Sequence, residues 1–449
     1  MIPFPISEAT PVAFPGPPPS ETDVVVIGGG VIGVCTALYL ARKGRRVVLL
    51  EKGRIAGEQS SRNWGWIRQQ GRDPDELPIM VEANRLWTEL ASQTNVDIGL
   101  KRSGVTYLAE SEKELQDFAD WLPFATAQGV DTELLDRAAL KTRFPELAKG
   151  GFAGAITTPS DMRAEPWVAV PALAGIAVRE GAVIAEACAA RKLDIAAGRI
   201  TGVFTEAGRI ACSDVVVAGG AWSSLFLRAN GVSIPQLSVR ASVGATEPVH
   251  LPHQGAAAGG KFAFRTRADG GASLAAGGFH ELFVGPDAFR ALPKFRAQLM
   301  AAPFGTRFLP AAPKGYPDAW GTKRQWAEDE VSPFEGIRVL NPTPHAGKLR
   351  KVAAEVEKLF PEVGPIRYRA MWAGMIDTMP DVVPVVDRVD AIPGLTIGTG
   401  MSGHGFGIGP GMGRVLADLV CGDAPGHDLR RFRMSRFSDG SAMELGPAL

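Results

Sequence analysis

The segment TDVVVIGGGVIGVCTALYLARKGRRVVLLEK, residues 22–52, contains the pattern of a strand, a turn, a helix and a second strand. The run from Asp23 to Ile27 is short, mostly apolar and β-branched, which is typical of a buried parallel strand. Val31–Lys43 has helical spacing, and Gly44 suits a helix C-cap. Arg46–Glu51 is a second apolar run that closes in an acid. The segment therefore predicts a βαβ unit.

The turn of this unit carries glycines in the spacing G-x-G-x-x-G. Gly28 permits a tight turn, Gly30 lets backbone approach a pyrophosphate, and Gly33 lets the helix pack on the strand. The first N–H groups of the helix face the phosphates, and Glu51 is placed to accept hydrogen bonds from a ribose. The pattern indicates a dinucleotide-binding domain, and by itself it does not separate NAD from FAD.

Composition limits the class of protein. The chain has 449 residues, 45% hydrophobic and 21% charged, with a formal net charge of zero, which predicts a globular protein of more than one domain. There is no basic stripe, so no nucleic-acid partner is expected. The four cysteines lack C-x-x-C spacing and the six histidines are dispersed, so we predict neither a disulfide framework nor a metal site.

Compartment follows from two further features of the sequence. Unpaired cysteines fit a reducing cytoplasm. No run of about 18 apolar residues is present, so no transmembrane segment is expected. We predict a cytoplasmic protein, with peripheral association with a membrane left open.

A loop of small and polar residues, Glu58–Arg62, directly follows the second strand. Ser60 and Ser61 can reach phosphate or ribityl oxygens, and Arg62 can offset phosphate charge; the alternative is a solvated loop. The run EKGRIAGEQSSR, residues 51–62, resembles the D-amino-acid-oxidase superfamily of flavoproteins, especially the bacterial L-amino-acid deaminases and D-amino-acid dehydrogenases. The resemblance extends from about Asp23 to Leu419.

This resemblance implies FAD as the cofactor, bound non-covalently because the loop has no cysteine or histidine to tether it. It places the Cys188–Arg191 segment at the adenine end and the glycine-rich turn Gly400–Gly409 at the flavin ring. For Gly219 and Gly220 a plain strand-to-helix turn remains an alternative, and for Gly400–Gly409 a surface loop. The expected cofactor contacts are Gly28, Gly30, Val31, Ile32, Gly33, Glu51, Lys52, Gln59, Ser60, Ser61, Arg62, Asn63, Trp64, Gly65, Ala189, Gly219, Gly220, Trp222, Gly374, Gly400, Met401, Gly403, His404, Gly405, Phe406 and Gly407.

The implied fold class is α/β, α+β overall. We expect a Rossmann-like FAD-binding domain and a substrate domain with a mixed or antiparallel sheet. A proline-rich arm precedes them and a tail follows. The predicted boundaries are 1–21 for the arm, 22–95, 150–235 and 365–430 for the FAD-binding domain, 96–149 and 236–364 for the substrate domain, and 431–449 for the tail.

An amino-acid substrate would bring a carboxylate, which arginine can hold bidentately. Arg265 is the first candidate, because FRTRADGG (residues 264–271) resembles a strand and turn of the deaminases in which the arginine binds that group; a solvated arginine is the alternative. Arg68 is the second candidate. Trp66 could wall the pocket or lie in the core, and the deaminases have glutamine there. His404 could contact flavin or substrate, or only satisfy backbone groups.

The predicted activity is hydride transfer from the Cα–H of an amino acid to flavin N5, followed by hydrolysis of the imino acid to a 2-oxo acid and ammonia. The partners are a small-molecule amino acid and an electron acceptor, such as oxygen or a quinone. Two alternatives stay open. One is oxidation of a secondary or N-methyl amino acid, and the other is a flavin subunit of a heteromeric electron-transfer complex.

Overall fold

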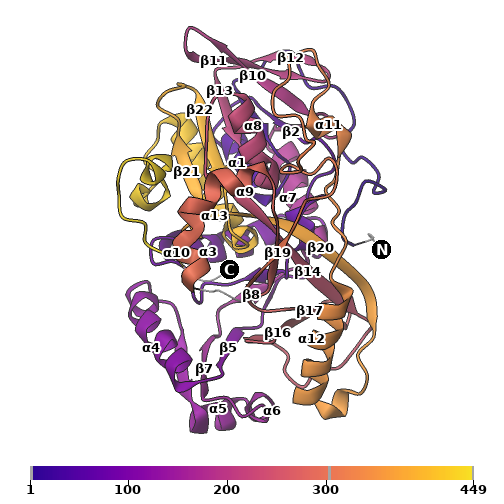
Figure 1. Ribbon diagram of the computed structural model, residues 1–449, viewed down its shortest axis with the longest axis vertical. Coiled ribbons are helices and arrows are strands. Elements are labelled where there is room, and N and C mark those ends of the chain that lie inside the picture. Colours follow the sequence, from indigo (N-terminus) through magenta and orange to yellow (C-terminus); the bar gives the residue numbers. More distant parts are fainter. Residues whose placement is uncertain (1–3, 302–304, 447–449) are drawn as a thin grey trace.

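The computed structural model describes residues 4–301 and 305–446, and it has two halves built around two large sheets (Figure 1). The first three residues of the predicted arm and the last three of the predicted tail lie outside the described residues. The upper half in Figure 1 holds a six-stranded, mostly parallel sheet, and the lower half belongs to a ten-stranded, mostly antiparallel sheet. The predicted α/β fold class with a second, mixed sheet is confirmed.

The six-stranded sheet has the predicted βαβ unit at its centre. β1 (Val24–Ile27) pairs in parallel with β2 (Val47–Leu50) on one side and with β13 (Asp214–Val217) on the other. The first connection runs through α1 (Val31–Arg42). The strands, in the order they have across the sheet, are β21 (Val385–Arg388), β22 (Leu395–Thr399), β13 (Asp214–Val217), β1 (Val24–Ile27), β2 (Val47–Leu50) and β9 (Val183–Ala185).

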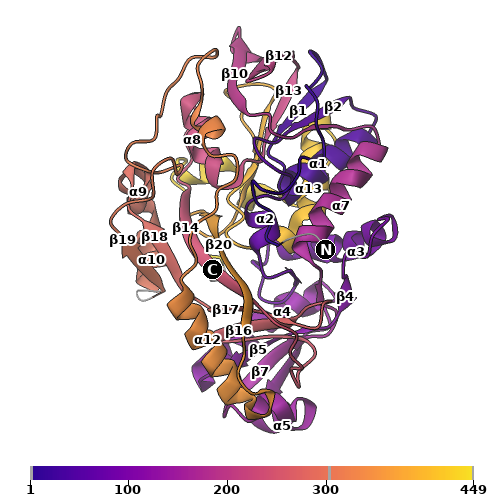
Figure 2. The ribbon, with the colours of Figure 1, turned by 90° about the vertical axis from the view of Figure 1, so that its right-hand side faces the viewer.

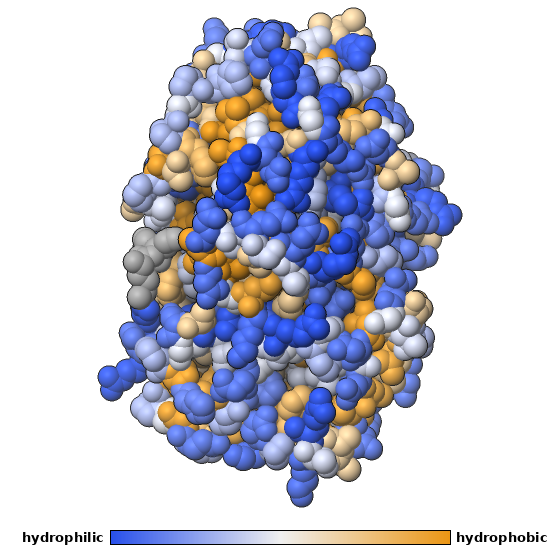
Figure 3. Space-filling model, turned by 180° about the vertical axis from the view of Figure 1, so that it is seen from behind, coloured by the Kyte–Doolittle hydropathy of each residue, from blue (hydrophilic) through white to orange (hydrophobic). Residues whose placement is uncertain are grey.

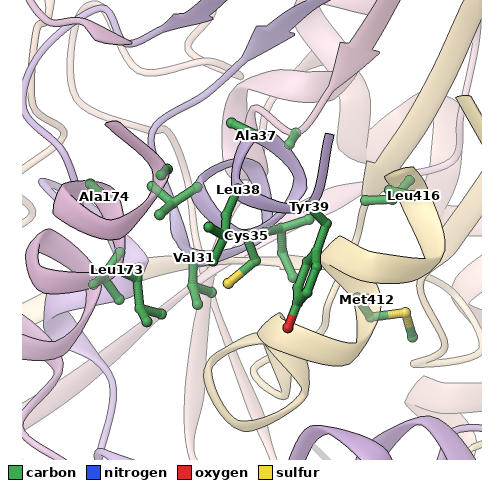
Figure 4. Close-up of a cluster of buried hydrophobic side chains, with 14 of the residues drawn as sticks. Val31, Cys35, Ala37, Leu38, Tyr39, Leu173, Ala174, Met412 and Leu416 are labelled. Carbon is green, nitrogen blue, oxygen red and sulfur yellow. The ribbon is translucent and has the colours of Figure 1, made fainter. Parts of the chain in front are cut away.

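The core of this half lies around α1, which packs between α7 (Pro166–Arg179) and α13 (Gly405–Cys421) (Figure 4). Cys35 and Leu38 of α1 are fully buried in one cluster with Leu173 of α7 and Met412 of α13. Every residue of α1 except its last is buried, so this helix is a core element that fixes the turn before it. α3 (Leu77–Ser92) packs against α13 on the outside.

The ten-stranded sheet is held together by two long strands, β14 (Leu237–Thr246) and β20 (Tyr368–Thr378), which pair antiparallel from Leu237↔Thr378 to Thr246↔Tyr368 (Figure 2). The other strands are β5 (Val105–Ala109), β6 (Glu133–Asp136), β7 (Gly154–Thr158), β15 (Ala256–Gly259), β16 (Phe262–Thr266), β17 (Ala272–Ala275), β18 (His280–Phe283) and β19 (Thr306–Leu309). The helices beside this sheet include α4 (Glu112–Ala127), α5 (Arg137–Arg143), α6 (Pro145–Ala148), α9 (Pro286–Ala291), α10 (Arg296–Ala301) and α12 (Ala346–Leu359).

Two smaller sheets complete the fold. One is the meander β10 (Ala190–Ala196), β11 (Arg199–Thr205) and β12 (Gly208–Ala211); the other joins β3 (Trp66–Ile67), β4 (Lys101–Arg102) and β8 (Met162–Arg163). The shorter helices are α2 (Gln59–Arg62), α8 (Ser223–Ala229) and α11 (Pro333–Gly336).

The strand assignments differ from the predicted domain boundaries at two places. The predicted boundaries include β7 and β20 in the FAD-binding domain, but both strands pair within the ten-stranded sheet. β7 is buried on both faces and β20 is mostly buried from Trp372 to Thr378, and an apolar run of this kind does not show in its sequence which strand it pairs with.

Three local predictions also need correction. The apolar run 209–218 predicts one strand, but it forms two strands in different sheets, β12 and β13, separated at Cys212 and Ser213. Residues 150–159 predict a hairpin or a strand pair, but they contain the single strand β7. The glycines from Gly405 to Gly409 belong to α13 instead of a loop, because buried neighbours enclose this helix and override the low helix propensity of glycine.

Side chains near both ends of the described chain pack against the rest of the protein. In the arm, Phe4 stacks on Trp167 with ring centroids 4.4 Å apart, and Ile6 is buried. In the tail, Phe432 is buried and Arg436 donates to Asp381 at 2.8 Å. Seen from behind, the surface is largely hydrophilic with separate hydrophobic patches (Figure 3). Across residues 4–301 and 305–446, helices are too short or too polar to cross a bilayer.

Candidate functional site

A cavity of about 810 Å³ lies where the two halves meet. It begins at the carboxyl ends of β1, β2 and β13, where ligands bind in open α/β sheets, and it reaches β5 and α4. Many of the residues predicted to contact the cofactor line it: Gly28, Gly30, Val31, Ile32, Glu51, Lys52, Gln59, Ser60, Arg62, Asn63, Trp64, Gly219, Gly220, Trp222, Gly374, Met401, Gly403, His404, Gly405, Phe406 and Gly407.

Backbone geometry forms the end of the cavity at β1. Gly28 has φ +115°, and a Cβ there would lie 2.4 Å from the Ala218 carbonyl oxygen. A Cβ at Gly33 would lie 1.9 Å from the Gly28 oxygen, so this glycine packs helix on strand and does not line the cavity. The Val31 N–H donates to Ser60 Oγ at 2.9 Å, which joins the helix start to α2. The resulting concave backbone surface is open at the N-terminus of α1.

Glu51 directly follows β2 beside this surface. Its carboxylate accepts hydrogen bonds from the backbone N–H of Gly29 at 2.7 Å and of Gly53 at 2.6 Å. Burial raises the pKa of Glu51 to about 7. Each carboxylate oxygen keeps a free lone pair, so the group can still accept from a ligand hydroxyl.

Arg62 and Lys52 line the cavity, and their charged groups already bind other groups of the protein. Arg62 donates to the carbonyl oxygens of Ile6, Gly57 and Ala373, each at 3.1 Å, and burial lowers its pKa to about 10. Lys52 pairs with Glu58 at 2.7 Å. The guanidinium of Arg62 ties the arm, α2 and β20 together, and its role in offsetting phosphate charge stays a prediction.

Other predicted residues support the wall from behind. Gly400 donates its N–H to Asp377 Oδ2 at 2.7 Å, which fixes the turn before α13. Ala190 lines the cavity, whereas the predicted residue, its neighbour Ala189, does not. The predicted residues that do not line the cavity are Gly33, Ser61, Gly65, Ala189, Gly400 and Arg265.

Arg265 lies behind the cavity wall, fully buried on β16. Its guanidinium binds Glu165 bidentately, Nη1 to Oε1 at 2.9 Å and Nη2 to Oε2 at 2.8 Å, and its Nε donates to the Trp64 carbonyl. Burial alone would raise the pKa of Glu165, but the charge and hydrogen bonds of Arg265 outweigh burial and lower it. This placement argues against the predicted role of Arg265, because its fork is used inside the protein.

Arg68 lies in the cavity instead. Its Nη2 lies 3.2 Å from His404 Nε2, its Nη1 donates to the Gln70 carbonyl, and its guanidinium lies 5.4 Å from the centroid of the Tyr107 ring. Within the described part of the chain, Arg68 has no carboxylate within ion-pair distance. Trp66 lies beside it, with its ring centroid 5.0 Å from that of Trp64.

His404 lies between Arg68 and a buried acid, and its Nδ1 has no hydrogen-bond partner among the described residues. Burial first, and then the charges of Arg72 and Arg68, hold the pKa of His404 well below its usual value, so the ring is neutral at pH 7. Glu76 Oε2 lies 3.8 Å from His404 Nδ1 and 3.4 Å from Arg72 Nη1, and burial raises the pKa of Glu76 to about 7. Because Arg68 can only donate, Nε2 accepts and the ring proton belongs on Nδ1, toward Glu76.

Several lining residues were not predicted. They lie on the stretch after β3, on β5, on α4 and on β18, and include Gln70, Tyr107, Phe118, Trp121 and His280. Trp121 Nε1 donates to the Arg72 carbonyl at 2.8 Å, which holds α4 over the cavity. A signal existed for Gln70, since positions 66, 68 and 70 alternate as in a strand. The sequence of α4 has no such pattern, because only the tertiary fold brings this helix to the cavity.

Residues 23–419 match the family described as DAO, FAD dependent oxidoreductase. The chain belongs to the DAO family. DAO-family membership confirms the resemblance seen in the sequence, and it makes the chain an FAD-dependent oxidoreductase.

A solved structure shares the fold of this DAO-family chain, and curated proteins are similar to it in sequence. The structure of the L-amino acid deaminase from Proteus myxofaciens in complex with anthranilate superposes with a TM-score of 0.90 and 30% identity, over 96% of this chain and 97% of that one. The D-amino acid dehydrogenase of Methylobacterium nodulans is 24% identical over 90% of this chain and 96% of its own. Human mitochondrial sarcosine dehydrogenase is 28% identical over 54% of this chain, and the match spans only 28% of that enzyme.

The cavity fits the FAD that the DAO family uses. The backbone surface at Gly28–Ile32 suits the pyrophosphate, Glu51 suits a ribose, and the glycine-rich start of α13 allows close approach of a planar ring. Among the residues that the structure describes, no group of three or more metal-ligating side chains is present.

Proposed function

We propose that this protein oxidises the Cα–N bond of an α-amino acid to the imino acid, which water hydrolyses to a 2-oxo acid and ammonia. FAD, when bound, supplies the acceptor for the hydride. One observation carries the proposal: the cavity that forms the dinucleotide cradle also contains Arg68, a cation without a carboxylate partner among the described residues.

Arg68 is the residue that we assign to the substrate carboxylate. The other arginines at the cavity are engaged, since Arg62 donates to three carbonyls and Arg72 pairs with Glu76. Arg68 is partly buried and donates to the Gln70 carbonyl, so its guanidinium keeps further N–H donors for an anion, and a substrate carboxylate would provide one. Tyr107 and Trp66 would lie against the rest of the substrate and exclude water.

FAD binding is proposed to be non-covalent. No cysteine lines the cavity over the described residues, and Gln59–Asn63 contains neither cysteine nor histidine. Glu51 would hold the ribose, and the Val31 end of α1 would face the pyrophosphate. His404 is neutral and lies beside Arg68, so its proposed role is to orient that arginine rather than to remove a proton.

A second candidate activity is oxidation of an N-methyl amino acid. The match to sarcosine dehydrogenase favours it. The chain spans less than half the length of the first curated relatives that it matches. The two candidates share the carboxylate site and differ in the substituent on the amine.

Anaerobic reduction of the bound flavin tests this proposal. The purified protein should be yellow, release FAD on acid precipitation, and lose its visible absorbance with at least one primary amino acid from a panel of D, L and N-methyl amino acids. Bleaching by N-methyl amino acids alone would favour the second candidate. FAD that dithionite reduces but no member of the panel reduces would contradict both.

A further inference from the structure

The extended stretch from Trp66 to Gln70 presents three polar side chains to the cavity. Trp66, Arg68 and Gln70 line it, whereas Ile67 and Gln69 do not. Side chains alternate between the two faces of an extended chain, which explains the pattern. Ile67 is buried in the core, and the Gln69 amide donates to Ser160 Oγ at 2.9 Å.

Gln70 is fully buried, and only half of its amide is satisfied. Its Oε1 accepts from Thr158 Oγ1 at 3.2 Å, and that hydroxyl lies 2.8 Å from Thr132 Oγ1. Its Nε2 has no hydrogen-bond partner among the residues that the structure describes. A buried donor without an acceptor is destabilising, so such an atom at a cavity wall indicates a ligand acceptor.

The neighbouring groups have the same polarity. Trp66 Nε1 is also buried without a partner in the described chain, and Arg68 offers a guanidinium. All three groups only donate, so the stretch suits an anion better than an amine. A carboxylate has about four lone-pair sites, enough for a bidentate arginine and further N–H donors.

We infer that Gln70 donates a hydrogen bond from Nε2 to the carboxylate that Arg68 binds. This inference rests on the proposed function, because it names a second residue for the same substrate group. Thr158 fixes the amide so that its oxygen is used within the protein. The opposite orientation of the Gln70 amide would present Oε1 to the substrate amine. In that case a negative charge at position 70 should tighten ligand binding instead of weakening it.

Anthranilate binding to the FAD-loaded protein tests the inference. The change in flavin absorbance measures that binding. Anthranilate supplies the carboxylate, and its neutral amide, anthranilamide, is the matched probe. Gln70→Met should weaken anthranilate binding about tenfold, the usual effect of losing a hydrogen bond to a charged group. Gln70→Glu should weaken it roughly hundredfold or more, since the new carboxylate repels the ligand and pairs with Arg68. Anthranilamide should lose less than tenfold in both.

Gln116→Glu is the control, because it adds the same charge on the exposed face of α4. It should leave the affinity for anthranilate unchanged. Equal affinity in wild type and Gln70→Glu would overturn the inference, and tighter binding by Gln70→Glu would assign the amide oxygen to the substrate amine instead. A wild type that binds anthranilate through Gln70 but oxidises no amino acid would contradict the proposed function and leave the anion site supported.

Discussion

Arg265 and Arg68 are two arginines near one cavity with opposite surroundings. Arg265 is held by both oxygens of Glu165, and the pKa of that acid is lowered. Arg68 faces the cavity with neutral His404 between it and Glu76, and the pKa of Glu76 is raised to about 7. A paired arginine stabilises the fold, and an arginine kept apart from acids is available to a ligand. Arg265 therefore has a structural role, and Arg68 is the arginine that we propose binds substrate.

Removing the paired arginine should have the largest effect. Arg265→Met leaves Glu165 buried without its cation, which should lower the free energy of unfolding by about 3–5 kcal/mol. Denaturant unfolding measures this loss. The double variant Arg265→Met, Glu165→Gln removes the unpaired charge and should recover part of the stability. If Arg265→Met is as stable as wild type but binds substrate much more weakly, Arg265 and not Arg68 would be the residue that binds the substrate carboxylate.

Removing the free arginine should change catalysis instead of stability. Arg68→Met should lower kcat/KM for an amino acid roughly hundredfold or more, about 3 kcal/mol of transition-state binding. Arg68→Lys should recover only part of it, because an ammonium lacks the bidentate fork. Arg85→Met, at an exposed position on α3, is the control. Steady-state kinetics measure kcat/KM for the three variants. Their FAD content and melting temperature show whether a loss of activity comes from lost cofactor or lost stability.

The two acids should give opposite pH dependences of stability. Glu165 has a lowered folded pKa, so its contribution is present above its unfolded pKa of about 4.5 and is lost as pH falls below it. Glu76 has a raised folded pKa, so its contribution is present below about 4.5 and is lost as pH rises toward 7. Glu76→Gln should therefore gain stability relative to wild type across that window, on the order of 1–3 kcal/mol. Unfolding curves from pH 4 to 8 measure it, and a constant difference would contradict the raised pKa.

The predictable part of the fold is local. The strand, glycine turn, helix and acid at residues 22–52 specify their geometry within one short segment, and the structure has them as predicted. β20 shows the limit, because its ten-residue pairing with β14 depends on a strand more than a hundred residues away. Periodicity shows that a strand is buried and does not show what it pairs with.

The candidate site shows the same limit. Arg265 resembled a carboxylate-binding arginine in sequence, but its partner Glu165 lies 100 residues earlier and only the fold brings them together. Arg68 and His404 were candidates on their own, whereas Glu76 becomes their neighbour only in the structure. Gln70 could have been found from the alternation after β3.

The most direct measurement compares an amino acid with its own α-amide. The amino acid that reduces the flavin fastest is chosen, and kcat/KM is measured for it and for its amide in wild type and in Arg68→Met. If Arg68 binds the carboxylate, wild type should favour the acid by roughly hundredfold, and Arg68→Met should abolish that preference while changing oxidation of the amide little. An unchanged preference in Arg68→Met would contradict the account.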